Sequence, residues 1–557
     1  MTTTGRTISS GSSGGRSTAS QQIILAMVVS LLSLPFMFSH PELLIAVGIV
    51  PFLPTLMRPA AAYLLFFICF SYFRLHEAYP FLEDFSMPLF LGGAGIAAFA
   101  YTVFDRSNAS GKPSQWQASA LFATVVAFGL AMTIVDPSAG PTPAQRIFTV
   151  LLAITASLAF YSWFRWLEEI DGEWGGEMRA FAALFVVLTL GLPFARELGI
   201  ALEYWLSTYW KIAATTLALA WLVRTQKLFF AATAIIVGAG LLIAAVAIYN
   251  GLNGYSLVEE TRVSIGRIYA SDIEPGAILI QKSALADPND LALVLLFPLG
   301  FATAGALKAG LPTIVRILCL ITVPCVTLGI MYTQSRGGAI GMLAVFGVTL
   351  LNIVKSRSII IVMLSAAAVA LVFGMALADR RSGGAAEYSQ SGIDESAEGR
   401  IIAWEAATKM AIAHPFMGVG MNSFVAHYFE YTPVWIGNNK AVHSTWFAML
   451  AEGGPLALVI LVTMFFRTFR GVHRIGASMS SNPELIGLEP VRIALLAALA
   501  GFAAGSTFLT QHIQWPIYIE LALAAALMRY VQSRSQPATT DLAGDSLNAR
   551  QEFTVSR

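Results

Sequence analysis

The chain has 557 residues, of which 56% are hydrophobic and 12% charged, with a net charge of +1 and a mean hydropathy of +0.68. These values exclude a soluble globular protein, because one soluble core does not need so much apolar surface. The three cysteines all lie inside apolar runs, so they are interpreted as small buried hydrophobic residues and not as a disulfide or metal framework.

Apolar runs with almost no internal charge follow one another along the chain. A helix of about 20 such residues crosses the roughly 30 Å of hydrocarbon in a bilayer. The sequence therefore predicts an all-α, polytopic transmembrane helical bundle with about 12 to 16 spans. The predicted spans are residues 22–38, 41–57, 60–75, 87–105, 117–135, 146–166, 180–196, 209–224, 228–248, 290–308, 312–332, 337–354, 358–377, 443–466, 490–508 and 512–530.

Polar segments flank the apolar region at both ends of the sequence. Residues 1–21, rich in Ser, Gly and Thr, are predicted to be a disordered cytoplasmic tail, and residues 532–557 a second disordered tail. Between them we expect an N-terminal transmembrane bundle, residues 22–249, followed by a second transmembrane region, residues 250–531.

Positive charge in alternate short loops predicts the orientation, because cytoplasmic loops retain Lys and Arg. With the N-terminus inside, the inside connections hold Arg58, Arg106, Lys112, Arg224, Lys227, Lys308, Arg316, Lys355, Arg357, Arg467, Arg470 and Arg474. One inside segment, residues 167–178, is acidic and fits this orientation poorly. The orientation leaves two long segments, residues 250–289 and 378–442, on the outer, periplasmic face.

The second long segment contains a predicted amphipathic helix at residues 399–413. This helix is expected to stop at His414-Pro415, because the residue before a proline avoids the helical region. Gly418 and Gly420 then mark a turn. The aromatic residues that follow suit either an anchor at the lipid headgroups or a platform for sugar rings.

Three basic residues on the outer side are candidates for chemistry, because charge at a membrane boundary is costly. Arg336 lies between two apolar runs, Arg400 begins the amphipathic helix, and His443 stands where the long segment re-enters the membrane. Each has a plainer reading. Arg336 would be a snorkelling interfacial arginine, Arg400 an exposed charge paired with an acid such as Glu398, and His443 a structural histidine.

Four short motifs, in order, resemble the O-antigen ligase and polymerase superfamily. They are Ser335-Arg336-Gly337, Gly399-Arg400 with Trp404, His414-Pro415 with Gly418 and Gly420, and His443-Ser444 with Glu452 and Gly454. An upstream Pro288-Asn289-Asp290 is similar to the Pro-Asn element of that family. Residues 71–77 are more weakly similar to ligases found beside exosortase systems.

The resemblance implies a GT-C-like membrane glycosyltransferase that moves a glycan from a polyprenyl diphosphate carrier to an acceptor hydroxyl. It implies that His443 is the general base, that Arg336 and Arg400 hold the diphosphate, and that displacement inverts the anomeric centre without a metal. Asn289, Trp404 and Glu452 are expected to help bind substrate. Arginine suits diphosphate because its planar fork binds phosphate oxygens bidentately, and histidine, with a pKa near about 6.5, suits proton removal at neutral pH.

Several alternatives stay open at this point. The acceptor can be lipid A core, a growing glycan as in a polymerase, or a protein side chain, which is disfavoured because only a short polar segment follows the last span. A multi-span transporter would share the composition, although it more often shows internal repeats and mid-span charges. We expect the bacterial inner membrane, a lipid-linked glycan donor, no cofactor and no nucleic-acid partner.

Overall fold

The computed structural model describes residues 60–74, 87–109, 114–133, 142–253, 288–333, 335–354, 356–358, 361, 365, 395–434 and 439–535. Several predictions fall outside these residues. They are the tail at 1–21, the spans at 22–38 and 41–57, most of the span at 358–377, most of the long segment 250–289, residues 378–394 and 435–438 of the second long segment, and residues 536–557 of the C-terminal tail.

Helices account for the regular structure of the described residues, in which no β-strand occurs. The first half contains α4 (Ala60–Ser71), α6 (Met87–Ala109), α7 (Gln115–Thr133), α8 (Pro143–Asp171), α9 (Gly176–Gly191), α10 (Leu198–Tyr204), α11 (Trp210–Leu222) and α12 (Gln226–Asn253). The second half contains α13 (Pro288–Leu307), α14 (Thr313–Tyr332), α15 (Arg336–Ile353), α17 (Glu395–Ala413), α18 (Phe424–Tyr431), α19 (Thr445–Ser481), α20 (Pro483–Ile486), α21 (Glu489–Gly505) and α22 (Trp515–Ser535).

Each predicted span that falls on described residues corresponds to one of these helices, with shifts at some ends. Helix α9 ends at Gly191, before the predicted 196, because Pro193 follows and lacks the N–H that a continuing helix needs. Helix α19 continues well beyond the predicted 466, carrying its arginines past the apolar part. Helix α22 runs to Ser535, three residues beyond the expected start of the C-terminal tail.

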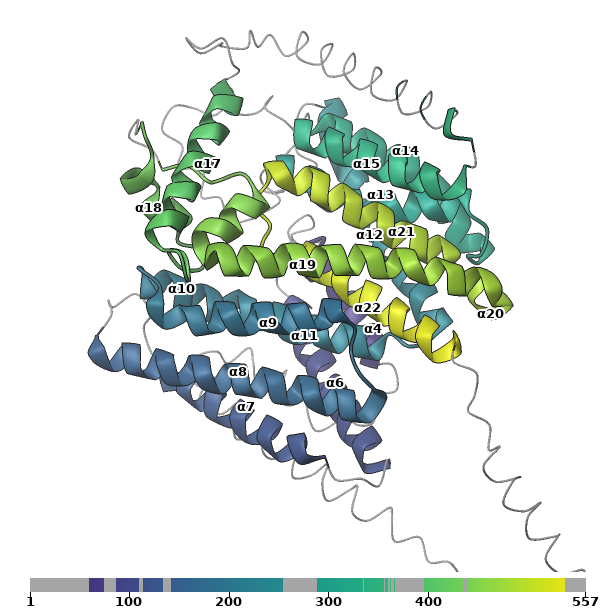
Figure 1. Ribbon diagram of the computed structural model, residues 1–557. Coiled ribbons are helices and arrows are strands. Elements are labelled where there is room, and N and C mark those ends of the chain that lie inside the picture. The colour runs from purple at the N-terminus through teal and green to yellow at the C-terminus, as the bar shows by residue number, and fades with distance from the viewer. Residues whose placement is uncertain are drawn as a thin grey trace, which may run out of the picture.

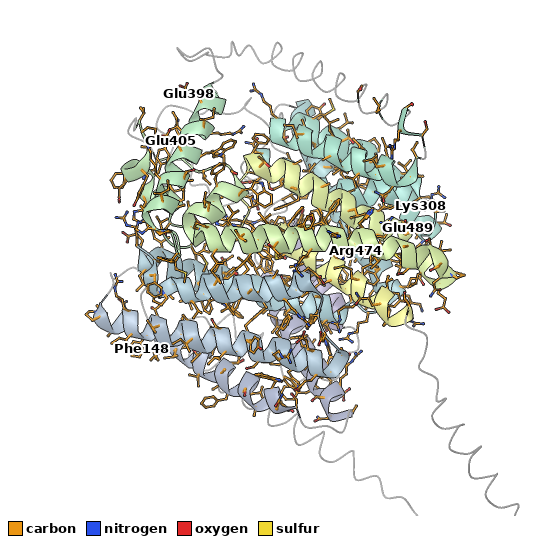
Figure 2. All side chains as sticks on the ribbon, in the orientation of Figure 1. Phe148, Lys308, Glu398, Glu405, Arg474 and Glu489 are labelled. Carbon is orange, nitrogen blue, oxygen red and sulfur yellow. The ribbon has the colours of Figure 1, made fainter. Side chains whose placement is uncertain are left out.

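In the described residues, nine helices are long and apolar enough to cross a membrane. Many of their apolar side chains face outward, among them Phe148 on α8, which is 39% exposed and lies on the outer surface in Figure 2. A soluble protein would bury such faces, whereas in a membrane they contact lipid chains that are equally apolar. The chain is therefore an all-α, multi-pass membrane protein.

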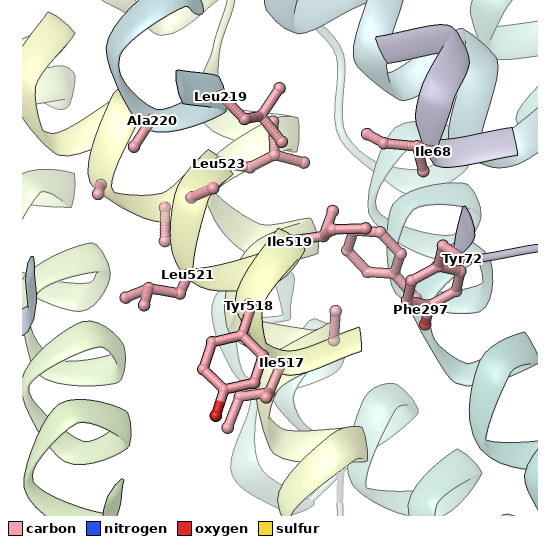
Figure 3. Close-up of a cluster of buried hydrophobic side chains, with 14 of the residues drawn as sticks. Ile68, Tyr72, Leu219, Ala220, Phe297, Ile517, Tyr518, Ile519, Leu521 and Leu523 are labelled. Atoms are coloured by element: carbon pink, nitrogen blue, oxygen red, sulfur yellow. The ribbon is translucent and has the colours of Figure 1, made fainter. Parts of the chain in front are cut away.

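One continuous hydrophobic core joins the two halves of the sequence. It runs from Leu64 on α4 to Val531 on α22. Helix α19 packs against α9, α21 and α22, and lies across the middle of the bundle (Figure 1). Helix α22 is deeply enclosed, because every residue from Pro516 to Met528 is buried. Figure 3 shows its side chains between α11 on one side and α4 and α13 on the other.

Helices α17 and α18 form a small unit at one end of the bundle, called the cap below (residues 395–434) (Figure 1). Helix α17 ends at Ala413, as His414-Pro415 predicts. The cap has its own core, in which Ala403, Ala407 and Met410 of α17 pack with Phe424 and Tyr428 of α18. Val442, Ala448 and Ala451 complete this core and attach the cap to the start of α19.

The end of the bundle opposite the cap carries many arginines and lysines. The acidic segment at residues 167–178, which fitted the predicted cytoplasmic side poorly, lies among them. Lys308 and Glu489 lie there, far from Glu398 and Glu405 of the cap (Figure 2). Asp171 receives two hydrogen bonds from Arg224, at 2.8 and 2.5 Å, and ion-pairs with Arg106 at 3.5 Å and Arg529 at 3.8 Å. Asp171 is thus matched by arginines from α6, from α22 and from the segment between α11 and α12.

Candidate active site

Trp404 ties the cap to the segment that contains His443. Its indole Nε1 donates a hydrogen bond of 3.1 Å to the carbonyl oxygen of Val442. Its ring stacks on Phe447 of α19, with centroids 5.1 Å apart and planes 8° apart. The middle of α17 is thereby fixed beside the residue that precedes His443.

Arg400 lies one turn before Trp404 on the same helix, and Phe508 lies beside both. The Arg400 guanidinium carbon is 5.9 Å from the centroid of the Phe508 ring. The Trp404 and Phe508 rings are 6.4 Å apart. Phe508 belongs to the short 3₁₀ turn η8 (Ser506–Phe508) that follows α21, so a residue more than 100 positions later in the chain lies against Arg400.

Arg336 begins α15, and the next residue, Gly337, lies close to Phe508. Ser335 caps this helix, its Oγ accepting from the Gly338 N–H at 3.1 Å and donating to Asn289 Oδ1 at 2.8 Å. A Cβ added to Gly337 would come within 3.2 Å of Phe508 Cβ, so glycine permits this close approach. Arg336 itself is exposed. The two arginines expected from the sequence therefore belong to elements that meet at one phenylalanine.

His443 has an unusual backbone conformation. Its φ is +47°, a left-handed value that a residue with a side chain adopts at some cost. It is half-buried, and the next residue, Ser444, is the N-cap of α19. Such strain persists only where surrounding contacts impose it, and it occurs often at functional sites. The Trp404–Val442 bond on one side and the helix cap on the other are those contacts here.

Glu452 is buried among protein groups on α19. Its carboxylate accepts from the backbone N–H of Asn422 at 2.8 Å and of Phe424 at 3.1 Å, and it contacts His512 Nε2 at 2.9 Å. Glu452 therefore holds the turn that begins α18 and joins it to the segment before α22.

The glycine turn after His414-Pro415 docks against the start of α19. The N–H groups of Val419 and Gly420 donate to the carbonyl oxygens of Ala451 and Glu452 at 2.8 and 3.2 Å. Gly418 has φ +64°, and a Cβ there would lie 2.3 Å from Ala451 O. Gly454, with φ +79° and ψ 173°, breaks α19 where Phe416 O would meet its Cβ at 2.8 Å. The Gly418-x-Gly420 turn and the Glu452-x-Gly454 segment of α19 therefore pack directly against each other.

His414 and His427 belong to a separate polar group around Arg196. Arg196 donates to Glu430 Oε2 at 2.6 Å, His427 Nδ1 lies 3.1 Å from Glu430 Oε1, and His414 Nε2 lies 3.0 Å from the Tyr431 hydroxyl. The Arg196 hydrogen bond is the main reason that the pKa of Glu430 is lowered. Burial, followed by the Arg196 charge, lowers the pKa of His414.

The segment between α21 and α22, residues 506–514, is the part of the site that sequence reasoning missed. Besides Phe508 and His512, it contributes Gln511, whose N–H donates to Thr445 Oγ1 at 3.0 Å and whose side chain donates to Asp290 Oδ1 at 2.9 Å. Thr445 Oγ1 in turn donates to Leu509 O at 2.7 Å. The polar run Thr510-Gln511-His512 between two apolar spans could have indicated this part of the site, because polar side chains at a membrane boundary are often functional.

All six residues expected from the sequence lie at the cap end of the bundle. Arg400 and Trp404 lie against Phe508, which the residue after Arg336 also approaches. His443 follows the residue bonded to Trp404, Asn289 binds the N-cap residue of α15, and Glu452 holds the turn before α18. In the described residues no group of three or more His, Cys, Asp or Glu side chains is placed to hold a metal ion.

Comparison with known proteins gives one family. No curated protein matches the chain. Residues 320–462 match the family model described as O-antigen ligase. The matched segment contains Arg336, the cap, His443 and Glu452, and indicates an O-antigen ligase-type activity that acts on glycan and lipid-linked substrates. The chain thus carries an O-antigen ligase domain within a multi-pass membrane protein, as the four motifs predicted.

Proposed function

We propose that this protein transfers a glycan from a polyprenyl diphosphate carrier to an acceptor hydroxyl, at the cap end of the bundle on the periplasmic face of a bacterial inner membrane. The observation that carries the proposal is the meeting of two arginine-bearing elements at Phe508. The Arg400 guanidinium lies over that ring, and Gly337, next to Arg336, packs on its Cβ. Two permanent cations at one membrane rim suit a diphosphate.

In this proposal Arg336 and Arg400 bind the diphosphate oxygens, and His443 is the general base. The acceptor hydroxyl loses its proton to His443 as its oxygen forms a bond to the anomeric carbon. The bond from that carbon to the diphosphate oxygen breaks at the same time, and the electron pair leaves with the carrier, whose added charge the arginines stabilise. Direct displacement of this kind inverts the anomeric centre and uses no metal.

The other expected residues take supporting roles. Asn289 binds Ser335, which caps the helix of Arg336, and Trp404 binds Val442, which precedes His443. Glu452 holds the turn between the cap and α19. These bonds support a role in positioning the reacting groups, beside any direct contact with substrate.

Orientation is testable with single cysteines in a chain whose three native cysteines are replaced by alanine. Thr408 is exposed on the cap, and Ala309 is exposed at the opposite end of the bundle. In intact inner-membrane vesicles of known sidedness, a membrane-impermeant thiol reagent should label Thr408→Cys only from the periplasmic side and Ala309→Cys only from the cytoplasmic side. The reverse pattern contradicts the proposed face.

The chemistry is testable with purified protein in lipid nanodiscs and a polyprenyl diphosphate-linked oligosaccharide. We expect His443→Ala to lower transfer by about 100-fold or more while donor binding is kept, since general bases contribute about 10²- to 10⁴-fold. Arg336→Lys and Arg400→Lys should weaken donor binding, because lysine lacks the bidentate fork.

Arg146→Lys is the matched control, because Arg146 is exposed on α8 at the same end of the bundle. Wild-type rates in both lysine variants of the site would contradict the diphosphate role, and loss of the wild-type reaction in EDTA would contradict the metal-free mechanism. Delipidated core oligosaccharide and a second lipid-linked oligosaccharide, offered separately, distinguish a ligase from a polymerase. Uptake of free oligosaccharide by proteoliposomes without transfer would instead indicate a transporter.

A further inference from the structure

A small, partly open cleft adjoins the segment that leads to His443. Five parts of the chain converge on it: α10, the turn and start of α18, the segment before α19, α19 itself, and the segment between α21 and α22. Its lining residues are Tyr204, Asn422, Phe424, Val425, Ala441, Val442, Glu452, Thr510, His512, Ile513 and Gln514. The residues from Thr510 to Gln514 have no part in binding the diphosphate or in the proposed proton transfer.

The lining has the chemistry of a neutral, hydroxylated ligand. Among the described residues that form it there is no lysine or arginine, whereas Arg336 and Arg400 lie at Phe508. A diphosphate would require cations here. The polar groups are instead hydroxyl, amide, imidazole and one carboxylate, which exchange hydrogen bonds with sugar hydroxyls.

Two buried polar atoms of the lining stand out. Within the described residues, neither His512 Nδ1 nor Thr510 Oγ1 has a hydrogen-bond partner. His512 is only 6% exposed, and its other nitrogen, Nε2, lies 2.9 Å from Glu452 Oε2. A carboxylate oxygen accepts in this contact, so Nε2 donates to Glu452 and Nδ1 is left to exchange a hydrogen bond with a ligand. Leaving such groups unsatisfied is costly, and a ligand that satisfies them gains that energy.

The cleft adjoins the segment that carries the proposed base. Val442 lines the cleft, while its carbonyl oxygen accepts from Trp404 on α17. His443 therefore follows a residue with the cleft on one side and the Arg400 helix on the other. An acceptor in the cleft and a donor held by the arginines would approach His443 from different directions, as a displacement requires.

We propose that this cleft is the acceptor subsite, and that His512 Nδ1 and Thr510 Oγ1 bind hydroxyl groups of the acceptor sugar. This inference rests on the proposed glycan transfer and adds to it the class of ligand and the groups that bind it. Glu452 contributes by fixing the orientation of the His512 ring through its contact with Nε2.

Two substitutions of His512 separate its two nitrogens. In His512→Gln the side-chain Nε2 still reaches the Glu452 position, but nothing replaces Nδ1. In His512→Asn the amide occupies the Nδ1 position, but the contact with Glu452 is lost. We expect His512→Gln to remain folded and to raise the KM for the acceptor about five- to tenfold, the value of one hydrogen bond. His512→Asn should lower thermal stability more and should affect the acceptor KM less.

Thr510→Val tests the second group without disturbing Glu452. The variant keeps the side-chain shape and removes the hydroxyl, so the acceptor KM should rise about fivefold, with kcat at saturating acceptor and the KM for the donor near wild-type values. Thr408→Val is the matched control, because Thr408 is exposed on α17 and its hydroxyl donates to Trp404 O at 2.9 Å. It should leave both KM values unchanged.

The assay uses the lipid-linked oligosaccharide donor with whichever acceptor the wild-type protein glycosylates, and a fluorescent form of that acceptor for direct binding. Acceptor KM values within twofold of wild type in both Thr510→Val and His512→Gln would overturn the inference, even if His443→Ala abolishes transfer and the proposed function stands. If the wild-type protein transfers nothing, the proposed function fails. Weaker binding of fluorescent core oligosaccharide to Thr510→Val than to wild type would still support the subsite, and equal binding would overturn it.

Discussion

The indole nitrogen of Trp404 and the carbonyl oxygen of Val442 are joined by a 3.1 Å hydrogen bond that fixes the cap to the residue before His443. Trp404→Phe keeps an aromatic ring for stacking on Phe447 and removes the N–H. We expect kcat for transfer to fall by about tenfold, because a small misplacement of a base is costly. Trp210→Phe removes a similar indole bond, to Leu206 O at 2.8 Å, away from the site, and should leave kcat unchanged. Equal effects of both changes would contradict this.

The left-handed backbone of His443 predicts different stabilities for two substitutions. His443→Gly and His443→Ala should both abolish transfer. Glycine adopts φ +47° without a Cβ penalty, so the glycine variant should be more stable than the alanine variant by about 1 kcal/mol. Thermal midpoints measured in one detergent at one scan rate compare them. An alanine variant as stable as the glycine variant would show that the backbone there is not strained.

The glycine turn of the cap predicts a strict requirement at Gly418. With φ +64° and the Ala451 carbonyl 2.3 Å from an added Cβ, Gly418→Ala must shift the backbone that docks on α19. We expect a lower thermal midpoint and little transfer, with strain of about 1 to 3 kcal/mol. Gly238→Ala on α12 is the control, since nothing lies within 4 Å of its added Cβ. A well-folded, active Gly418→Ala protein would contradict the close contact.

The arginines around Asp171 predict that this carboxylate is needed for folding. Asp171→Asn would leave Arg106, Arg224 and Arg529 without their shared counter-charge, and breaking such a partly buried network costs about 3 kcal/mol. Glu173→Gln removes a carboxylate that is 81% exposed and should change stability very little. Yield and thermal midpoint of the two purified variants measure the difference, and equal midpoints would refute the prediction.

The lowered pKa of His414 predicts a dependence of stability on pH. Burial and the Arg196 charge favour the neutral ring in the folded protein, so its pKa lies below the ordinary 6.5, although Glu430 opposes this and His427 supports it. As pH falls below about 6.5, the unfolded chain takes up a proton that the folded chain does not, and stability is lost until the folded pKa is reached. His414→Gln should lose less of its thermal midpoint than wild type between pH 7.5 and pH 5.5. An equal loss in both proteins would contradict this.

The sequence by itself determined the helices and the class of the protein. Length and polarity of an apolar run decide locally whether a segment crosses a bilayer, so every predicted span on described residues is a helix, and the all-α membrane fold is confirmed. His414-Pro415 set the end of α17 for an equally local reason. The motifs also led to the O-antigen ligase family, which the match at residues 320–462 confirms. The roles of Arg336, Arg400 and His443 stay predictions.

Only the tertiary structure decided which of these elements meet. Hydropathy does not specify neighbours, because most apolar helices fit lipid and one another about equally well, and small residues and polar contacts select the pairs. Phe508 between Gly337 and Arg400, His512 on Glu452, and three distant arginines on Asp171 are all such contacts. The left-handed His443 is likewise imposed by bonds to α17 and α19, and not by the residue type, which ordinarily avoids that conformation.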